Sequence, residues 1–130
     1  MTIEKPLTDF RILLVEDSLD NQFLIKKLLT KKGAMVEVVD NGSAGVHRAL
    51  ESDFDVVLMD IQMPTMDGYS AIQKLKENNY SQPVIALTAH AMSEERTLTK
   101  KAGFAAHITK PITFDLLIDS IRSVARASNT

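Results

Sequence analysis

The sequence contains no cysteine and no tryptophan among its 130 residues. The absence of cysteine excludes disulfide bonds, zinc ribbons and thiol catalysis. Lysine and arginine number 15 against 17 acidic residues, a balance that argues against a domain binding DNA chiefly through its phosphates. No apolar run approaches the roughly 18 residues of a membrane helix. What remains is an ordinary globular composition, 45% hydrophobic and 25% charged, at the length of a single domain.

Short apolar runs rich in β-branched residues recur along the chain and predict the strands of a sheet. The runs span residues 12–15, 35–39, 56–59 and 84–87, and a weaker fifth candidate covers 105–109. They are too short for helices. Their continuous apolarity predicts burial on both faces, as in a parallel sheet.

Amphipathic stretches of helix length lie between and after these runs. The first is predicted to end before Gly33, a glycine in C-cap position. Its buried stripe is predicted to consist of Leu24, Ile25, Leu28 and Leu29. The other helices are predicted over residues 42–51, 69–76 and 93–103 and from 113 or 115 onward, the last with Leu116, Leu117, Ile118, Ile121 and Val124 facing inward.

Five strands that alternate with five helices predict one α/β domain with helices on both faces of a parallel sheet. We expect this domain over residues 10–126, with 1–9 as a flexible leader and 127–130 as a flexible C-terminus. Because the first eight residues hold no apolar stretch, we expect no signal peptide and a soluble, cytoplasmic chain.

Polar residues directly follow four of the predicted strands. Glu16 and Asp17 follow the first, Asp60 the third, Thr88 the fourth and Lys110 the fifth. We expect these side chains to meet, because ligands bind at the carboxyl ends of parallel strands. Carboxylates about 4 Å apart repel by about 4 kcal/mol at an effective dielectric of about 20, so the three acids need a compensating cation. Lys110 supplies one positive charge, and Mg²⁺ suits an oxygen-only site.

Four motifs, taken together, resemble the receiver domain of two-component response regulators. They are Val15-Glu16-Asp17, MDIQMPTMDG at residues 59–68, Leu87-Thr88-Ala89 and Lys110-Pro111, in this order over about residues 11–126. In detail, the residues in and around these motifs are most similar to those of receivers of hybrid sensor kinases or of stand-alone phosphorelay regulators. The resemblance implies a flavodoxin-like, doubly wound sheet of five parallel strands in the order 2-1-3-4-5 with five helices. It also implies a phosphorylation switch with no output domain in this chain.

The resemblance further implies a phosphorylation site at Asp60 and a Mg²⁺ site around it. Asp17 and Asp60 would bind the metal directly, the backbone carbonyl of Gln62 would be a third ligand, and Glu16 would act through water. A carboxylate beside Mg²⁺ and a lysine is set up as a nucleophile toward a phosphoryl group.

The same resemblance assigns switch roles to residues after the last two strands. Lys110 would pair with Asp60 and then bind the phosphoryl oxygens, Thr88 would move to hydrogen-bond to the group, and Ala89 would leave room for it. The Lys110–Pro111 bond is expected to be cis. Three residues before Lys110 the family usually places Tyr or Phe. This chain has His107 there, so both a coupling of His107 to Thr88 and an ordinary strand-end role stay open.

The phosphodonor implied by the resemblance is a histidine kinase or a histidine phosphotransfer protein. Leu19, Gln22 and Phe23 on the first helix, together with Pro111, form its expected docking surface. The lysines at 26, 27, 31 and 32 are expected to be a solvated face.

Other hypotheses weigh the same residues differently. Taken singly, Asp17 or Ser18 could simply cap the first helix, and Thr88 could be a turn residue. A phosphatase with an aspartyl nucleophile would need an acid where Gln62 stands, and a nucleotide binder would be repelled by Glu16 and Asp17. The alternative that stays open is a receiver-like protein-interaction module that is not phosphorylated.

Overall fold

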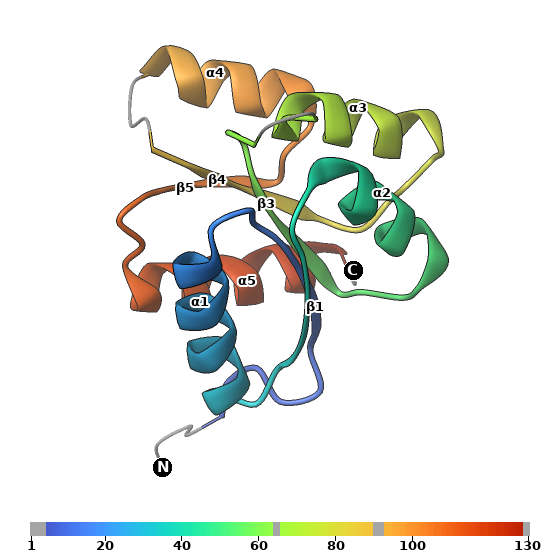
Figure 1. Cartoon of the computed structure of the whole chain (residues 1–130). Coiled ribbons are helices and arrows are strands. Elements are labelled where there is room, and N and C mark those ends of the chain that lie inside the picture. Colours follow the sequence, from blue (N-terminus) through green and yellow to red (C-terminus); the bar gives the residue numbers. More distant parts are fainter. Residues whose placement is uncertain (1–4, 64–65, 90–92, 129–130) are drawn as a thin grey trace.

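The computed structural model describes residues 5–63, 66–89 and 93–128, and its strands and helices alternate as the sequence predicts (Figure 1). The strands are β1 (Arg11–Val15), β2 (Met35–Val39), β3 (Val56–Asp60), β4 (Val84–Thr88) and β5 (Ala106–Thr109). The helices are α1 (Leu19–Lys31), α2 (Gly42–Glu51), α3 (Gly68–Glu77), α4 (Ser93–Ala102) and α5 (Phe114–Ser128).

The strands form one parallel sheet in the order β2-β1-β3-β4-β5. This confirms the predicted flavodoxin-like order. β3 lies between β1 and β4, so Met59 pairs with Val15 on one side and with Ala86 on the other. The residues that follow β1, β3, β4 and β5 therefore meet along one edge, and Asp60 lies at its centre.

Two hydrophobic cores flank the sheet, because successive side chains of a strand point to opposite faces. Helices α1 and α5 cover one face, where Ile12, Leu14 and Leu58 pack against residues such as Ile25 and Leu117. On the other face, α2, α3 and α4 cover Leu13, Val57 and Met59 among others. The large apolar side chains of β1, β3 and β4 in both cores are buried, and each contributes about 1.5–3 kcal/mol of burial free energy.

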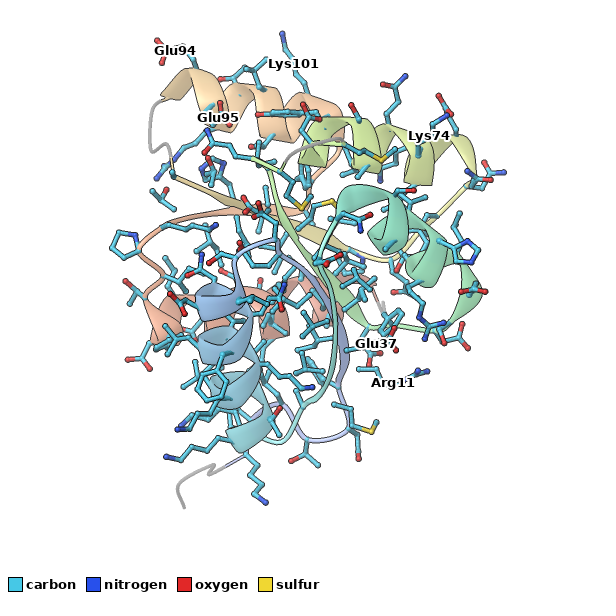
Figure 2. The ribbon with its side chains drawn as sticks, viewed as in Figure 1. Arg11, Glu37, Lys74, Glu94, Glu95 and Lys101 are labelled. Atoms are coloured by element: carbon cyan, nitrogen blue, oxygen red, sulfur yellow. The ribbon has the colours of Figure 1, made fainter. Side chains whose placement is uncertain are left out.

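Two leucines that were predicted to be buried are exposed instead. Leu24 of α1 is 52% exposed and Leu116 of α5 is 53% exposed. Each lies at the margin of its helix's apolar stripe, next to residues such as Ile25 and Leu117 that are buried. Charged side chains occupy the outer surfaces, as Figure 2 shows for Glu94 and Lys101 on α4.

The segment before β1 is more ordered than predicted. Residues 5–9 were expected to belong to a flexible leader, but Leu7 is fully buried in the core under α1. Its backbone N–H donates to the carbonyl of Lys32 at 3.0 Å. Gly33 follows with φ of 104°, as the C-cap prediction requires, and a Cβ there would lie 2.9 Å from Thr8. At the other end α5 continues to Ser128, beyond the predicted boundary at 126.

Candidate functional site

The predicted acidic residues converge at the carboxyl edge of the sheet. Asp60 ends β3 and is 3% exposed, and Glu16, which follows β1, is fully buried. Asp17 lies beside them with its side chain exposed. Carboxylate oxygens of Glu16, Asp17 and Asp60 all lie within 4.8 Å of one another.

Lys110 is the cation of this cluster. Its Nζ lies 3.1 Å from Glu16 Oε2 and 3.1 Å from Asp60 Oδ2, so one ammonium group bridges two buried carboxylates. The backbone N–H of Lys110 donates to the carbonyl of Thr88 at 2.7 Å, which fixes the start of the loop after β5 against the end of β4. The Lys110–Pro111 peptide bond is cis, as expected.

The electrostatics of the cluster are unbalanced. Burial raises the pKa of Glu16 above its ordinary value, and repulsion by Asp60 raises it further, against the attraction of Lys110. Burial alone would lower the pKa of Lys110, but the attraction of Asp60 and Glu16 outweighs it and raises that pKa. One lysine therefore does not neutralise three carboxylates, and the site favours a further cation.

The donor set fits Mg²⁺. It consists of carboxylate oxygens from the loop after β1 and from the end of β3, and the cluster includes no histidine. Hard divalent cations take oxygen ligands, and Mg²⁺ typically uses one or two carboxylates and keeps several waters. Gln62 is exposed beside Asp60, and its backbone N–H donates to Asp60 Oδ1 at 3.1 Å. This bond holds one carboxylate oxygen of Asp60 while Lys110 holds the other.

Ser18, not Asp17, caps α1. Its side chain accepts the backbone N–H of Asn21, and its own N–H donates to Glu16 Oε1 at 3.3 Å. Asp17 is therefore not needed to cap α1, so helix capping does not explain why an acidic residue stands at this position. The side-chain amide of Gln22 donates to the carbonyl of Glu16 at 2.6 Å and holds the same loop.

Thr88 and Ala89 lie at the expected place. Thr88 ends β4 and is fully buried next to the cluster, and Ala89 is exposed beyond it. Other residues of the resembling motifs, Pro64 and Thr65 after β3 and His90 to Met92 after β4, lie outside the described residues.

Within the described residues, the side chain of His107 forms a hydrogen bond with Thr99 of α4. Its Nδ1 lies 3.1 Å from the hydroxyl oxygen of Thr99, which is 2% exposed. That hydroxyl donates to the carbonyl of Arg96 at 3.0 Å, so it accepts from an Nδ1–H of His107. The histidine thus joins β5 to α4. The sequence patterns did not point to Thr99. It stands out there only as an uncharged residue in a strongly polar helix.

A second contact holds the amino-terminal part of α4. The hydroxyl of Tyr69 in α3 donates to Glu95 Oε1 at 3.0 Å, and the Tyr69 ring packs edge-on against Phe104 at 6.1 Å. Burial and the Glu95 carboxylate raise the pKa of Tyr69 to about 12. Contacts from β5 and from α3 therefore hold α4 in position.

The expected docking residues lie beside the site. Leu19 is 78% exposed and Phe23 is 69% exposed, and both line a hollow with Gln22, Lys26 and Val38. Pro111 is exposed after Lys110. The side-chain amide of Gln22 is bonded to the loop after β1, whereas Leu19 and Phe23 are exposed.

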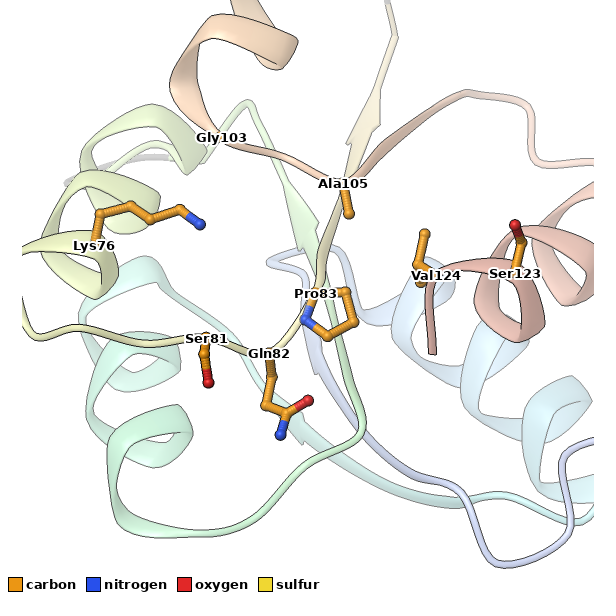
Figure 3. Close-up of a pocket in the computed structure, with 8 residues that line it drawn as sticks. All are labelled: Lys76, Ser81, Gln82, Pro83, Gly103, Ala105, Ser123 and Val124. Carbon is orange, nitrogen blue, oxygen red and sulfur yellow. The ribbon is translucent and has the colours of Figure 1, made fainter. Parts of the chain in front are cut away.

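Another hollow lies at the opposite end of the strands (Figure 3). Its lining includes Pro83 and Ala105, which precede β4 and β5, and Lys76, Ser81, Gln82, Gly103, Ser123 and Val124 complete it. Since ligands of parallel sheets bind at the carboxyl ends, the acidic edge is the stronger candidate for a functional site.

The comparisons with known proteins agree with this geometry. Residues 12–122 match the response regulator receiver domain family, and the chain belongs to this family. It is 41% identical over 107 residues to the sensor protein GacS of Pseudomonas syringae, which covers 78% of this chain and 12% of that protein. It is 40% identical over 114 residues to the kinase BarA of Escherichia coli, covering 82% and 12%. The chain thus spans about an eighth of these sensor kinases.

Solved structures show the same architecture. The receiver domain of a sensor histidine kinase from Pseudomonas aeruginosa, which has a magnesium ion in its active-site cleft, superposes with a TM-score of 0.82 at 35% identity, covering 89% of this chain and 97% of that one. A Francisella response regulator receiver domain gives 0.88 at 26% identity, covering 92% and 99%. Within the described residues, no helix is long and apolar enough to cross a membrane.

Proposed function

We propose that this receiver domain accepts a phosphoryl group on Asp60 from a phosphohistidine of a histidine kinase or phosphotransfer protein, with Mg²⁺ bound. The observation that carries the proposal is the cluster itself: Asp60 is buried at the end of the central strand, within reach of two further carboxylates and 3.1 Å from Lys110. The reaction belongs in the cytoplasm, and the domain would catalyse only its own phosphorylation and dephosphorylation.

In the proposed reaction, an oxygen of the Asp60 carboxylate attacks phosphorus. The new O–P bond forms as the P–N bond to the donor histidine breaks, and the imidazole nitrogen keeps the electron pair of that bond. Asp17, Asp60 and the Gln62 carbonyl would hold Mg²⁺, with Glu16 acting through water. When bound, the metal supplies positive charge that offsets the phosphoryl oxygens.

The residues around Asp60 would then stabilise the product. The ammonium of Lys110 is free to exchange carboxylate for phosphoryl oxygens, to which it can form charge-assisted hydrogen bonds. Thr88 would turn its hydroxyl toward the same group, and the small side chain of Ala89 would leave space for it.

Phosphorylation by acetyl phosphate tests the proposal. With Mg²⁺, we expect mass spectrometry to show one added phosphoryl group, located on Asp60. Asp60→Ala should remain unlabelled, and EDTA should abolish labelling, because the uncompensated carboxylates repel the incoming anion. Equal labelling of Asp60→Ala would overturn the assignment.

The alternative, an interaction module that is not phosphorylated, makes a different prediction. Beryllofluoride mimics a phosphoryl group on a carboxylate, so the proposed function requires that it bind only when Mg²⁺ is present. If the chain bound no beryllofluoride either with or without Mg²⁺, the result would favour the interaction module.

A further inference from the structure

The exposed face of α1 carries a groove that the docking residues described above do not explain. Phe23, Lys26, Lys27, Thr30 and Lys31 line this hollow of ≈ 630 Å³, which we call the basic groove. Their spacing of three and four residues places them on one continuous stripe of the helix. The groove shares Phe23 and Lys26 with the hollow beside Leu19 and continues toward the carboxyl end of α1.

The lysines of the basic groove form no ion pairs within the described part of the chain. Among residues 5–63, 66–89 and 93–128, no carboxylate lies within ion-pair distance of Lys26, Lys27 or Lys31. Lys27 instead lies over the Phe23 ring, with Nζ 5.7 Å from its centre. The three side chains are exposed, so their charges are available to a partner.

The charge of this surface changes sign along α1. The acidic cluster lies beyond the amino end of the helix, with Asp20 in its first turn, and the basic groove covers its second half. Leu19 and Lys27 are eight residues apart, which corresponds to about 12 Å along the helix axis. A partner that covers both regions must therefore present its own charges in the opposite order.

We propose that the basic groove selects, among histidine donors, those that carry carboxylates facing the second half of α1, about 12 Å along the helix axis from the contact with Leu19. This inference rests on the proposed function, since it names the charge pattern of the donor that docks on Leu19 and Phe23. The groove combines the Phe23 ring with lysine stems, so it accepts the aliphatic part of a glutamate while the ammonium groups meet its carboxylate.

An acidic protein segment fits better than an anionic membrane. A flat anionic surface that covered the basic groove would also approach Asp17 and Asp20, which would repel it. A protein surface can place its acids only where the lysines lie. Attraction of this kind acts mainly on the rate of association and on the choice of partner.

Phosphotransfer measurements with paired charge reversals test the inference. Each histidine donor encoded by the source cell is phosphorylated with labelled ATP and mixed with the chain, and the fastest donor becomes the probe. We expect Lys26→Glu with Lys27→Glu to lower the transfer rate constant at low salt by about tenfold or more. The difference should shrink with added salt, because at about 0.1 M the screening length is about 10 Å.

The matched control is Lys100→Glu with Lys101→Glu, an exposed lysine pair on α4, well separated from α1 in Figure 2. It should keep the parent transfer rate. Acetyl phosphate should label both variants like the parent, because a small donor does not need α1. Changing the donor's facing acids to lysine should restore transfer to the Lys26→Glu, Lys27→Glu variant.

Three results would overturn the inference. They are a parent-like transfer rate for the α1 reversal at low salt, an equal loss for the α4 control, or reversal-sensitive binding to phosphatidylglycerol vesicles without any effect on transfer. Failure of acetyl phosphate to label the parent chain would instead count against the proposed function itself, so the two failures are distinguishable.

Discussion

Lys110 shows how one residue can serve two charge states of the site. In the structure it bridges Glu16 and Asp60 at 3.1 Å, and in the proposed product it would bind phosphoryl oxygen. Lys110→Ala leaves the acids less compensated, so we expect Mg²⁺ affinity at least equal to that of the parent. Phosphorylation by acetyl phosphate should slow by about a hundredfold, the usual loss when one such donor is removed.

Titration calorimetry for Mg²⁺ and a labelling time course measure these two effects. Lys101→Ala, an exposed lysine of α4, is the control for general charge change. Markedly weaker Mg²⁺ binding by Lys110→Ala would contradict the compensation argument.

Glu16 makes the stability of the metal-free chain depend on pH. Burial raises its pKa, so the folded chain holds the proton at pH values where the unfolded chain has lost it. The contribution of Glu16 to the free energy of unfolding therefore falls as pH rises from about 4.5 through the raised pKa. We expect Glu16→Gln to be more stable than the parent at neutral pH, with the difference vanishing on acidification.

Urea unfolding in EDTA at several pH values measures this difference. Glu94→Gln on α4 is exposed and serves as the control. A difference between parent and Glu16→Gln that grows on acidification would show that burial does not dominate at this carboxylate.

At the scale of elements, α1 would bring the donor to the acidic edge. Leu19 and Phe23 are exposed and touch no core, so their truncation should leave the fold intact. We expect Phe23→Ala and Leu19→Ala to slow transfer from a histidine donor by about tenfold or more, since a buried apolar anchor of an interface contributes more than about 1 kcal/mol. Acetyl phosphate labelling should stay nearly unchanged.

The matched control is Leu98→Ala, because Leu98 is a 52% exposed leucine on α4. It should not alter transfer. Equal losses with the histidine donor and with acetyl phosphate would mean that Leu19 and Phe23 support the site rather than the donor.

The hydrogen bond between His107 and Thr99 attaches α4 to β5. We expect Thr99→Val to destabilise the chain by about 1 kcal/mol, because the half-buried His107 loses its hydrogen-bond partner. In a double-mutant cycle with His107→Phe, the two changes should be coupled by a similar amount. Additive effects in urea unfolding would show that the contact contributes nothing.

Sequence patterns predicted the elements well because short, continuously apolar β-branched runs differ from the longer amphipathic stretches of helices. The residues at strand ends could be predicted too, since a parallel sheet forces Glu16, Asp60 and Lys110 to one edge. Leu24 and Leu116 could not be placed, because periodicity does not show where an apolar stripe ends. Nor could the contact between Thr99 and His107, which depends on how a helix packs on a strand.

At the scale of the whole molecule, Mg²⁺ should stabilise the fold by relieving repulsion within the acidic cluster. A ligand at a hundred times its dissociation constant contributes about 2.7 kcal/mol, so thermal unfolding should shift upward by several degrees. Asp17→Asn should lose most of this shift, whereas Glu94→Gln on the outer side of α4 should retain it. Thermal unfolding followed by circular dichroism measures the effect. If Mg²⁺ raised the unfolding temperature of Asp17→Asn as much as that of the parent, the ion would bind elsewhere.

The buried Leu7 has a consequence for how the domain can be attached to anything else. Leu7 is hydrogen-bonded to Lys32, just before the start of β2, and Ser123 and Val124 near the end of α5 line the hollow at the amino ends of β4 and β5. Both described ends therefore leave from the side of the sheet opposite Asp60. A tether at either end, whether a solid support or a neighbouring domain, leaves the acidic edge facing outward and open to a diffusing donor.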